Sequence, residues 1–226
     1  MSRNPFSALA AWFRQPGQRH RLLLLYWLIY LPGYVLSGRL HRPVHAVCTA
    51  IALDGRIPFV EAFIVPYLLW ILILMGLVAY GVLREPRMFT HLMWFLMLTF
   101  TAAVLTFWLF PTYAGVRPAE VPGRGVFAAL TRFVYWIDAD ANACPSEHII
   151  GVFAIVFAVW DSRALSRPWI KGLTVLTALA IIASTALVKQ HAVLDILAAL
   201  PISLIGGFVC FWLPNRKAAS GSGEPI

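Results

Sequence analysis

The residues best suited to chemistry lie in two short polar segments, each at the start of an apolar stretch. Pro145-Ser146-Glu147-His148 opens one stretch, and the segment from Lys189 to Asp195 opens another. Histidine has an ordinary pKa close to neutrality, so a histidine at such a position can move a proton or attack an electrophile. The pattern indicates a site built from two histidines at the mouths of two helices.

His191 and Asp195 are four residues apart, a spacing that places two side chains on one face of a helix. A carboxylate there accepts a hydrogen bond from one imidazole nitrogen and leaves the lone pair of the other nitrogen exposed. Such a histidine is a positioned nucleophile or base. The same spacing also fits an ordinary capping or interfacial pair, because polar residues are common at helix ends.

The other segment predicts an anion site. Pro145 suits the first turn of a helix, where its missing N–H costs nothing. The free N–H groups of that turn attract an anion, Ser146 can add a hydroxyl donor, and His148 can protonate a leaving oxygen. Arg117 and Lys189 can neutralise a phosphoryl group, although an isolated cation at a membrane edge is commonly an anchor.

The composition indicates that these segments belong to a polytopic membrane protein. Of the 226 residues, 60% are hydrophobic and 12% are charged, and the mean hydropathy is +0.76. Soluble domains carry about 25% charged residues. The formal charge of +8 lies mostly in connections between apolar runs, which favours a membrane and no nucleic-acid partner.

We expect an all-α fold with a six-helix membrane domain over residues 22–213. A spanning helix needs about 20 mostly apolar residues. The expected spans are Leu22–Leu40, Pro58–Leu83, Phe89–Phe110, Pro145–Trp160, Trp169–Thr185 and His191–Leu213. Residues 1–21 read as a basic segment that is either a short interfacial helix or a disordered tail, and residues 214–226 as a disordered tail.

The basic residues orient this bundle. Eleven of the 18 lysines and arginines fall on the side that holds both termini, whereas most acidic residues fall on the other side. Because basic residues concentrate in cytoplasmic connections, we expect cytoplasmic termini in the inner membrane. The two histidines then face the periplasmic or extracellular side.

The motifs resemble those of the type 2 phosphatidic acid phosphatase (PAP2) superfamily. Its three motifs are Lys-x6-Arg-Pro, Pro-Ser-Gly-His and Ser-Arg-x5-His-x3-Asp. They correspond here to Arg117-Pro118, to Pro145-Ser146-Glu147-His148, and to Ser184-Thr185 followed by His191 and Asp195. The chain departs from the pattern at Phe110, Glu147 and Thr185, where the family has Lys, Gly and Arg. Two of the three family cations are therefore missing.

The resemblance, over about residues 57–210, implies a lipid phosphatase that works through a phosphohistidine without metal or other cofactor. His191 would attack phosphorus, Asp195 would orient it, and His148 would protonate the leaving group. Arg117, Lys189, Ser146 and Ser184 would hold the phosphoryl oxygens. The substrate would be a lipid phosphate or diphosphate, such as phosphatidate, phosphatidylglycerophosphate or a polyprenyl diphosphate.

Several alternatives stay open. Flanking residues such as Ile57-Pro58-Phe59 resemble inositol phosphorylceramide synthase-like members, which favours headgroup transfer to a lipid alcohol. A six-helix transporter is the non-enzymatic alternative, although charges concentrated at helix ends favour an enzyme. The oligomeric state is open. The remaining options are a divalent cation at Asp138, Asp140 and Glu147, and a disulfide between Cys48 and Cys144.

Overall fold

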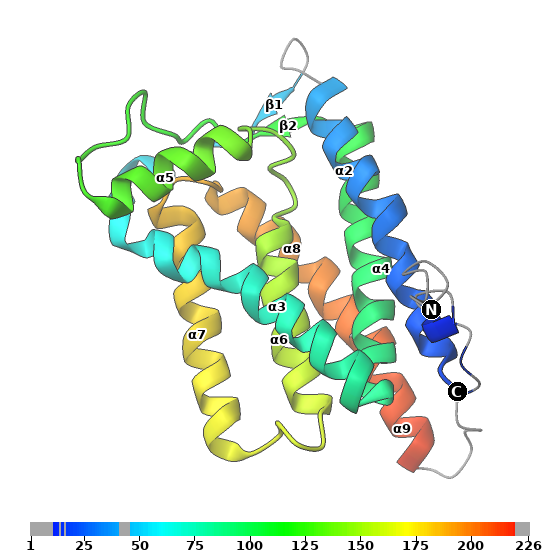
Figure 1. The fold of residues 1–226 in the computed structure, drawn as a ribbon. Coiled ribbons are helices and arrows are strands. Elements are labelled where there is room, and N and C mark those ends of the chain that lie inside the picture. The colour runs from blue at the N-terminus through cyan, green and yellow to red at the C-terminus, as the bar shows by residue number, and fades with distance from the viewer. Residues whose placement is uncertain (1–10, 14, 16, 41–45, 220–226) are drawn as a thin grey trace, which may run out of the picture.

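The computed structural model describes residues 11–13, 15, 17–40 and 46–219, and it is mostly helical (Figure 1). The long helices are α2 (Trp27–Leu40), α3 (Ile64–Arg84), α4 (Pro86–Leu109), α6 (Glu147–Asp161), α7 (Pro168–Leu187) and α8 (Val193–Gly207). Shorter elements are the 3₁₀ helices η1 (Arg19–Tyr26), η2 (Asp54–Arg56) and η3 (Glu61–Phe63), the helix α5 (Val126–Ile137), the π-helical η4 (Phe208–Trp212) and α9 (Leu213–Ala219).

Five helical stretches in the described part of the chain are long and apolar enough to cross a membrane. They are Arg19–Gly38, Glu61–Arg84, Pro86–Leu109, Pro168–Leu187 and Val193–Arg216. Each overlaps one of the six expected spans, so the chain is an all-α, multi-pass membrane protein by helix length and composition. The remaining expected span, Pro145–Trp160, corresponds to α6, whose 15 residues extend about 22 Å, less than the roughly 30 Å of a bilayer core.

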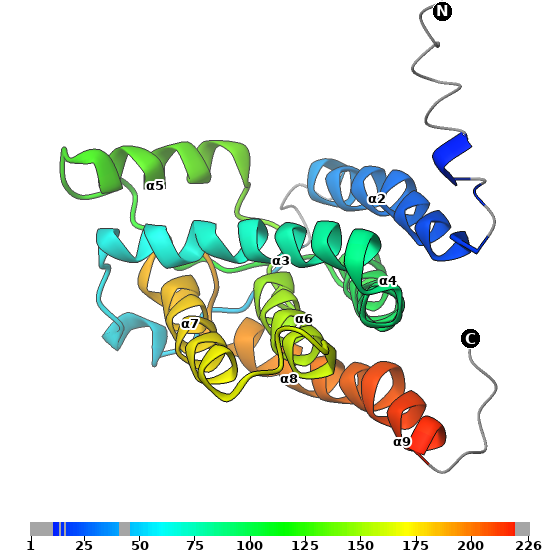
Figure 2. The ribbon, with the colours of Figure 1, turned by 60° about the horizontal axis from the view of Figure 1, so that its bottom comes forward.

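The short helix α6 is nevertheless the centre of the bundle. It packs against α3, α4, α7 and α8 (Figure 2). Its buried residues, among them Ile149, Ile150 and Ala154, lie on several sides of the helix. A Cβ on Gly151 would lie 2.7 Å from Trp70 Cζ3, so glycine is required for α3 to approach α6 this closely.

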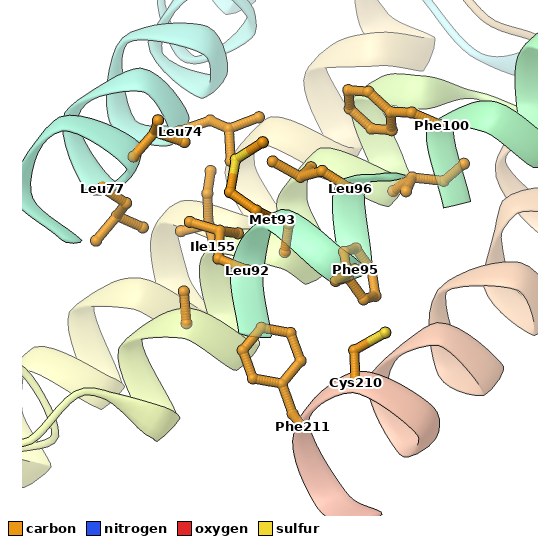
Figure 3. Packing of buried hydrophobic residues seen from close by; sticks show 14 of the residues in the cluster. Leu74, Leu77, Leu92, Met93, Phe95, Leu96, Phe100, Ile155, Cys210 and Phe211 are labelled. Atoms are coloured by element: carbon orange, nitrogen blue, oxygen red, sulfur yellow. The ribbon is translucent and has the colours of Figure 1, made fainter. Parts of the chain in front are cut away.

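The main core joins α3, α4, α6 and η4 (Figure 3). Leu74 of α3 and Ile155 of α6 face Leu92, Leu96 and neighbouring residues of α4, and Phe211 of η4 closes the cluster. Lipid tails are as apolar as these side chains, so van der Waals packing rather than exclusion from water holds such helices together.

A small parallel sheet, not expected in an all-α fold, links two loops at one end of the bundle. Strand β1 (Val47–Cys48) pairs with β2 (Thr112–Tyr113). The pair brings the loop after α2 against the loop after α4, near α5 (Figure 1). It thereby fixes the start of the loop that leads to Arg117.

Helix α5 was also missed, because its 12 residues are too few for a span. Ala128, Thr131 and Val134 are buried at a spacing of three residues, and α5 packs against η3 and α3. Phe133 and Trp136 remain exposed. The helix is therefore apolar on its outer face as well.

The C-terminal prediction needs a correction. Residues 214–219 are helical because η4 and α9 continue α8 without a break. Asn215 fixes this end by donating a hydrogen bond to Asp161 Oδ1 at 2.7 Å. Residues 220–226, and most of the expected N-terminal segment 1–21, lie outside the described residues. Within that segment, residues 11–13 are helical and η1 begins at Arg19.

Candidate active site

His148 and His191 meet at one end of the bundle. The distance from His148 Nδ1 to His191 Nε2 is 3.0 Å. His191 Nδ1 lies 3.2 Å from the carbonyl oxygen of Ala143, and a carbonyl only accepts, so this nitrogen carries the proton. His191 Nε2 therefore carries the ring's lone pair, and in this conformation that lone pair accepts the Nδ1–H of His148. The two rings share one proton along a defined direction.

Asp195 lies behind His191, but in a different local geometry from the one expected. His191 lies in the turn before α8, one residue ahead of the N-cap Ala192, so the pair does not share a helical face. Asp195 Oδ2 accepts the backbone N–H of Ala192 at 2.8 Å and lies 3.5 Å from His191 Nδ1. The carboxylate caps the helix and places a negative charge beside the ring.

The backbone fixes the separation of the two histidines. The N–H of Ser146 donates to the carbonyl of Asp195 at 3.0 Å, which joins the start of α6 to the start of α8. The ring of His148 then stacks on Tyr67, with centroids 4.6 Å apart, and lies 4.7 Å from the ring of Trp70. Both aromatic rings come from α3, so three helices position this histidine.

Arg117 lies on the same side as the histidines. Its guanidinium lies 4.5 Å from the centre of the Tyr135 ring and donates a hydrogen bond to Gln190 Oε1. Burial raises the pKa of Tyr135 to about 12, against the opposing effect of Arg117, so the Tyr135 hydroxyl stays neutral. Arg117 is therefore held by α5 and by the turn before α8.

Three buried donors around the histidines have no hydrogen-bond partner among the described residues. They are Arg117 Nε, Gln190 Nε2 and Ser146 Oγ. Ser146 is the N-cap of α6, yet its hydroxyl does not cap the helix. An unsatisfied buried donor costs about 1–3 kcal/mol. An anion with several oxygen atoms can satisfy donors of this kind.

The histidines, Arg117 and Gln190 line a cavity of about 320 Å³. Its polar wall also includes Asp138 and Glu147, and its apolar wall comes from α2, α3 and α4. Burial raises the pKa of Asp138, although Arg117 and His191 act against this. A second cavity, of about 660 Å³, shares Tyr34 and residues 138–142 with the first.

Lys189 and Ser184 do not line the cavity. Lys189 Nζ donates to the backbone carbonyls of Asp54 at 2.8 Å and Ile57 at 2.6 Å. Its backbone has a φ of +55°, which belongs to the sharp turn before α8. Ser184 is fully buried and donates to the carbonyl of Ile181 at 2.6 Å. In this conformation neither side chain is free to bind a phosphate as expected.

Thr185, at the position of the family arginine, also bonds within its own helix. Its hydroxyl donates to the carbonyl of Ile182 at 2.8 Å. Arg117 is thus the one lysine or arginine among the described residues that line the cavity. The two cations by which the chain departs from the PAP2 motifs therefore have no substitute among the described cavity residues.

The acidic residues considered as metal ligands accept hydrogen bonds from separate parts of the chain. Asp140 accepts the backbone N–H groups of Ala114 at 2.9 Å and Gly115 at 3.2 Å, whereas Glu147 accepts the Tyr30 hydroxyl. Within the described residues no three His, Cys, Asp or Glu side chains form a group that could hold a metal ion. The thiols of Cys48 and Cys144 are free.

Gln190, Glu147 and Asp138 are the cavity residues whose role was missed from sequence. Gln190 lies in the polar segment from Lys189 to Asp195 that precedes the last span, and its polarity there was the available signal. Glu147 stood out as a departure from Pro-Ser-Gly-His and as a possible metal ligand, not as a residue of this cavity. Asp138 receives hydrogen bonds from Tyr34 at 3.4 Å and Tyr67 at 3.5 Å, contacts that no local pattern indicates.

Comparison with protein-family models, curated proteins and solved structures gives no match for this chain. The functional inference therefore depends on the side chains that meet at this end of the bundle.

Proposed function

We propose that this chain is an integral membrane phosphatase of PAP2 type, which hydrolyses a lipid phosphate or diphosphate through a phosphohistidine without a metal. The observation that carries the proposal is the His148–His191 pair. Nδ1 of His148 lies 3.0 Å from Nε2 of His191, and His191 carries its proton on Nδ1, so its lone pair is on Nε2. One ring is thereby suited to attack phosphorus and the other to manage a proton.

In the first step the hydrogen bond between the two rings breaks, His191 Nε2 donates its freed lone pair to phosphorus, and an N–P bond forms. The bond from phosphorus to the leaving oxygen breaks, and this oxygen takes a proton from the imidazolium form of His148. The anionic substrate favours that protonated form. Asp195 and the carbonyl of Ala143 stabilise the positive charge that develops on the phosphorylated His191 ring.

In the second step water replaces the histidine. His148, now neutral, accepts a proton from water as the water oxygen bonds to phosphorus. The N–P bond breaks, inorganic phosphate leaves, and both histidines return to their starting forms. Arg117 Nε and Gln190 Nε2 line the cavity, have no protein partner among the described residues, and would hold the phosphoryl oxygens. Ser146 Oγ also lacks a partner but is fully buried and does not line the cavity, so it would join them only after a local movement.

The walls of the cavity support a lipid substrate. Leu31 of α2 and Ile71 of α3 line the cavity and are also exposed on the outside of the bundle. An acyl or polyprenyl chain can therefore lie between α2 and α3 while its phosphate reaches the histidines. The exposed aromatic face of α5 suits the membrane surface at the same end.

The charge pattern supports cytoplasmic termini in the inner membrane. The histidine end then faces the periplasm or the exterior. In this arrangement α6 also crosses the membrane and brings the number of spans to six. The turn before α6 extends its length, and the surrounding helices shield its ends from lipid.

Headgroup transfer to a lipid alcohol is the second candidate function. The specific observation in its favour is the single cation among the described cavity residues, which matches a phosphodiester with one negative charge better than a monoester with two. The second cavity, across residues 138–142, offers room for an acceptor. In this reaction an alcohol oxygen replaces water in the second step.

The test is phosphate release by the purified protein from a panel of lipid phosphates and diphosphates in EDTA. Acid-labile, base-stable label on His191 after mixing with a ³²P-labelled substrate is the result expected for a phosphohistidine. Added lipid alcohols test for transfer. The absence of release, transfer and labelling across the panel would overturn the proposal in favour of a transporter.

A further inference from the structure

Glu147 is a buried carboxylate beside the reactive pair without a complete set of partners. It is 8% exposed, lines the cavity and immediately precedes His148. Oε2 accepts the Tyr30 hydroxyl, but Oε1 has no hydrogen-bond partner among the described residues. A buried carboxylate oxygen in this condition calls for a donor or a positive charge.

The charged residues that line the cavity also favour a positively charged ligand. Three acidic residues, Asp138, Asp140 and Glu147, line the cavity with a single lysine or arginine, Arg117, among the described residues. The proposed chemistry commits Arg117 to the phosphate. An acidic side chain is then left next to the phosphate position, where it would repel a purely anionic substrate and attract one that also carries a positive charge.

The remaining wall is aromatic. Trp27, Tyr30, Tyr34, Trp70 and Phe100 all line the cavity. Tyr30 is central to this wall, because its ring lies 5.4 Å from Trp27, 6.0 Å from Tyr34 and 5.2 Å from Phe100. Aromatic faces gathered around a carboxylate form the environment that binds ammonium groups through cation–π attraction.

We infer that Glu147 and the Tyr30-centred aromatic wall bind an ammonium group of the substrate, while its phosphate lies at Arg117 and the two histidines. The inference rests on the proposed phosphoryl-transfer function and names its substrate class, an amino-lipid phosphate. A hydroxyl would also satisfy Oε1, but it would gain nothing from the aromatic faces.

A lipid can carry an ammonium group close to its phosphate in two ways. The amine can belong to the lipid itself, as in a long-chain base phosphate, which is a phosphomonoester. It can instead belong to the headgroup, as in an ethanolamine phospholipid, which is a phosphodiester. In both, two carbons link the ammonium nitrogen to the phosphate oxygen, a short spacing that fits a cavity lined by both Glu147 and His148.

The test compares two matched lipid pairs in detergent micelles of fixed composition. Sphingosine 1-phosphate is paired with ceramide 1-phosphate, and phosphatidylethanolamine with phosphatidylglycerol, so that each pair differs in its amine. The rate ratio within each pair is measured for the native protein and for Glu147→Gln. We expect a preference of about tenfold for the amine in one pair and a ratio near one for the variant.

Glu120→Gln is the matched control, because it makes the same change at an exposed glutamate that does not line the cavity. This variant should keep the preference for the amine. The pair that shows the preference identifies the source of the ammonium group. Equal rates within both pairs, or a preference that survives in Glu147→Gln, would overturn the inference.

Binding to the His191→Ala variant separates this inference from the proposed function. The quenching of tryptophan fluorescence is followed with sphingosine 1-phosphate, ceramide 1-phosphate and the two phospholipids. Tighter binding of an amino lipid without turnover by the native protein would leave the inference standing and remove the phosphoryl-transfer function. Turnover without any preference for the amine, in rate or in binding, would leave the phosphoryl-transfer function standing and overturn the inference about the ammonium group.

Discussion

His91 and His191 each face an aspartate, at opposite ends of the bundle, and their surroundings differ in kind. His91 Nδ1 lies 2.9 Å from Asp161 Oδ2, and Asn215 donates to the other oxygen of this carboxylate at 2.7 Å. His191 Nδ1 lies 3.5 Å from Asp195 Oδ2. Asp195 Oδ1 and nearby donors on Arg117, Gln190 and Ser146 lack partners among the described residues.

The difference separates a structural histidine from one suited to chemistry. At the His91 end each described contact joins helices, and Asp161 links α6 to α4 and α9. At the His191 end the polar groups converge on a cavity and keep unused hydrogen-bonding capacity. Unused capacity in a buried place costs stability and is retained where a ligand can satisfy it.

The largest expected effect contrasts the two histidines directly. His191→Ala should lower the rate of phosphate release about 10⁴-fold or more, because it removes the proposed nucleophile. The measurement is the initial rate in EDTA with the best lipid of the panel. Retention of more than one tenth of the rate would remove His191 from the mechanism.

His91→Ala is the matched control. It leaves the Asp161 carboxylate short of one donor and should cost about 1–3 kcal/mol of stability. The rate per folded molecule should change little, since His91 lies at the opposite end from the cavity. A melting curve in detergent and an active-site titration by phosphohistidine labelling separate the two effects.

A smaller effect tests the geometry of the cation. Arg117→Lys keeps the charge but loses the planar group that lies over Tyr135 and bonds Gln190. The rate should fall about 10–100-fold, because lysine cannot reproduce a forked contact with phosphate. The rate is compared in low and high salt. Full activity in this variant would show that charge alone is needed.

Lys189→Met tests the reassignment of a cation from the site to the scaffold. The ammonium group donates to two carbonyls of the loop around η2, so its loss should lower stability by about 1–2 kcal/mol. The rate per folded molecule should change less than threefold. A loss of activity comparable with that of Arg117→Lys, without a change in melting temperature, would return Lys189 to the phosphate site.

The smallest effect concerns the end opposite the cavity. Burial acts to raise the pKa of Glu85, but hydrogen bonds from Ser162 Oγ, the Arg163 N–H and Tyr80 outweigh it and hold the pKa below its ordinary 4.5. A lowered carboxyl pKa contributes stability that is present above the unfolded value and lost as the pH falls through the folded one.

The melting temperature of the native protein should therefore decline as the pH falls below about 4.5. Glu85→Gln should melt lower near neutral pH and show a shallower acid decline. The same acid dependence in native and variant proteins would assign it to other carboxyl groups.

Hydropathy alone was sufficient to predict most of the membrane-spanning helices. The five long apolar stretches need only their own composition, so they appear in the structure close to their expected bounds. The ends of the helices were less predictable, because Asn215 and Asp161 hold α9 through a contact between distant segments. Helix α5 was missed because its burial depends on η3 and α3 rather than on its length.

For the candidate site, helix connectivity was enough to bring His148, His191 and Arg117 to one end. The direction of individual side chains was not accessible from local patterns. Lys189 turns away because carbonyls of Asp54 and Ile57, 135 and 132 residues distant in the chain, accept its protons. Gln190 faces the cavity in its place, next to Arg117.

The bonds that join the two histidine segments also bear on how the protein is made. His191 and Ala143 are 48 residues apart in the chain, and the bond between Ser146 and Asp195 closes a similar loop across α6 and α7. During synthesis, a nascent chain that has inserted only as far as α7 has His148 without its partner. Catalytic competence would thus arise late, when the last helix enters the bilayer.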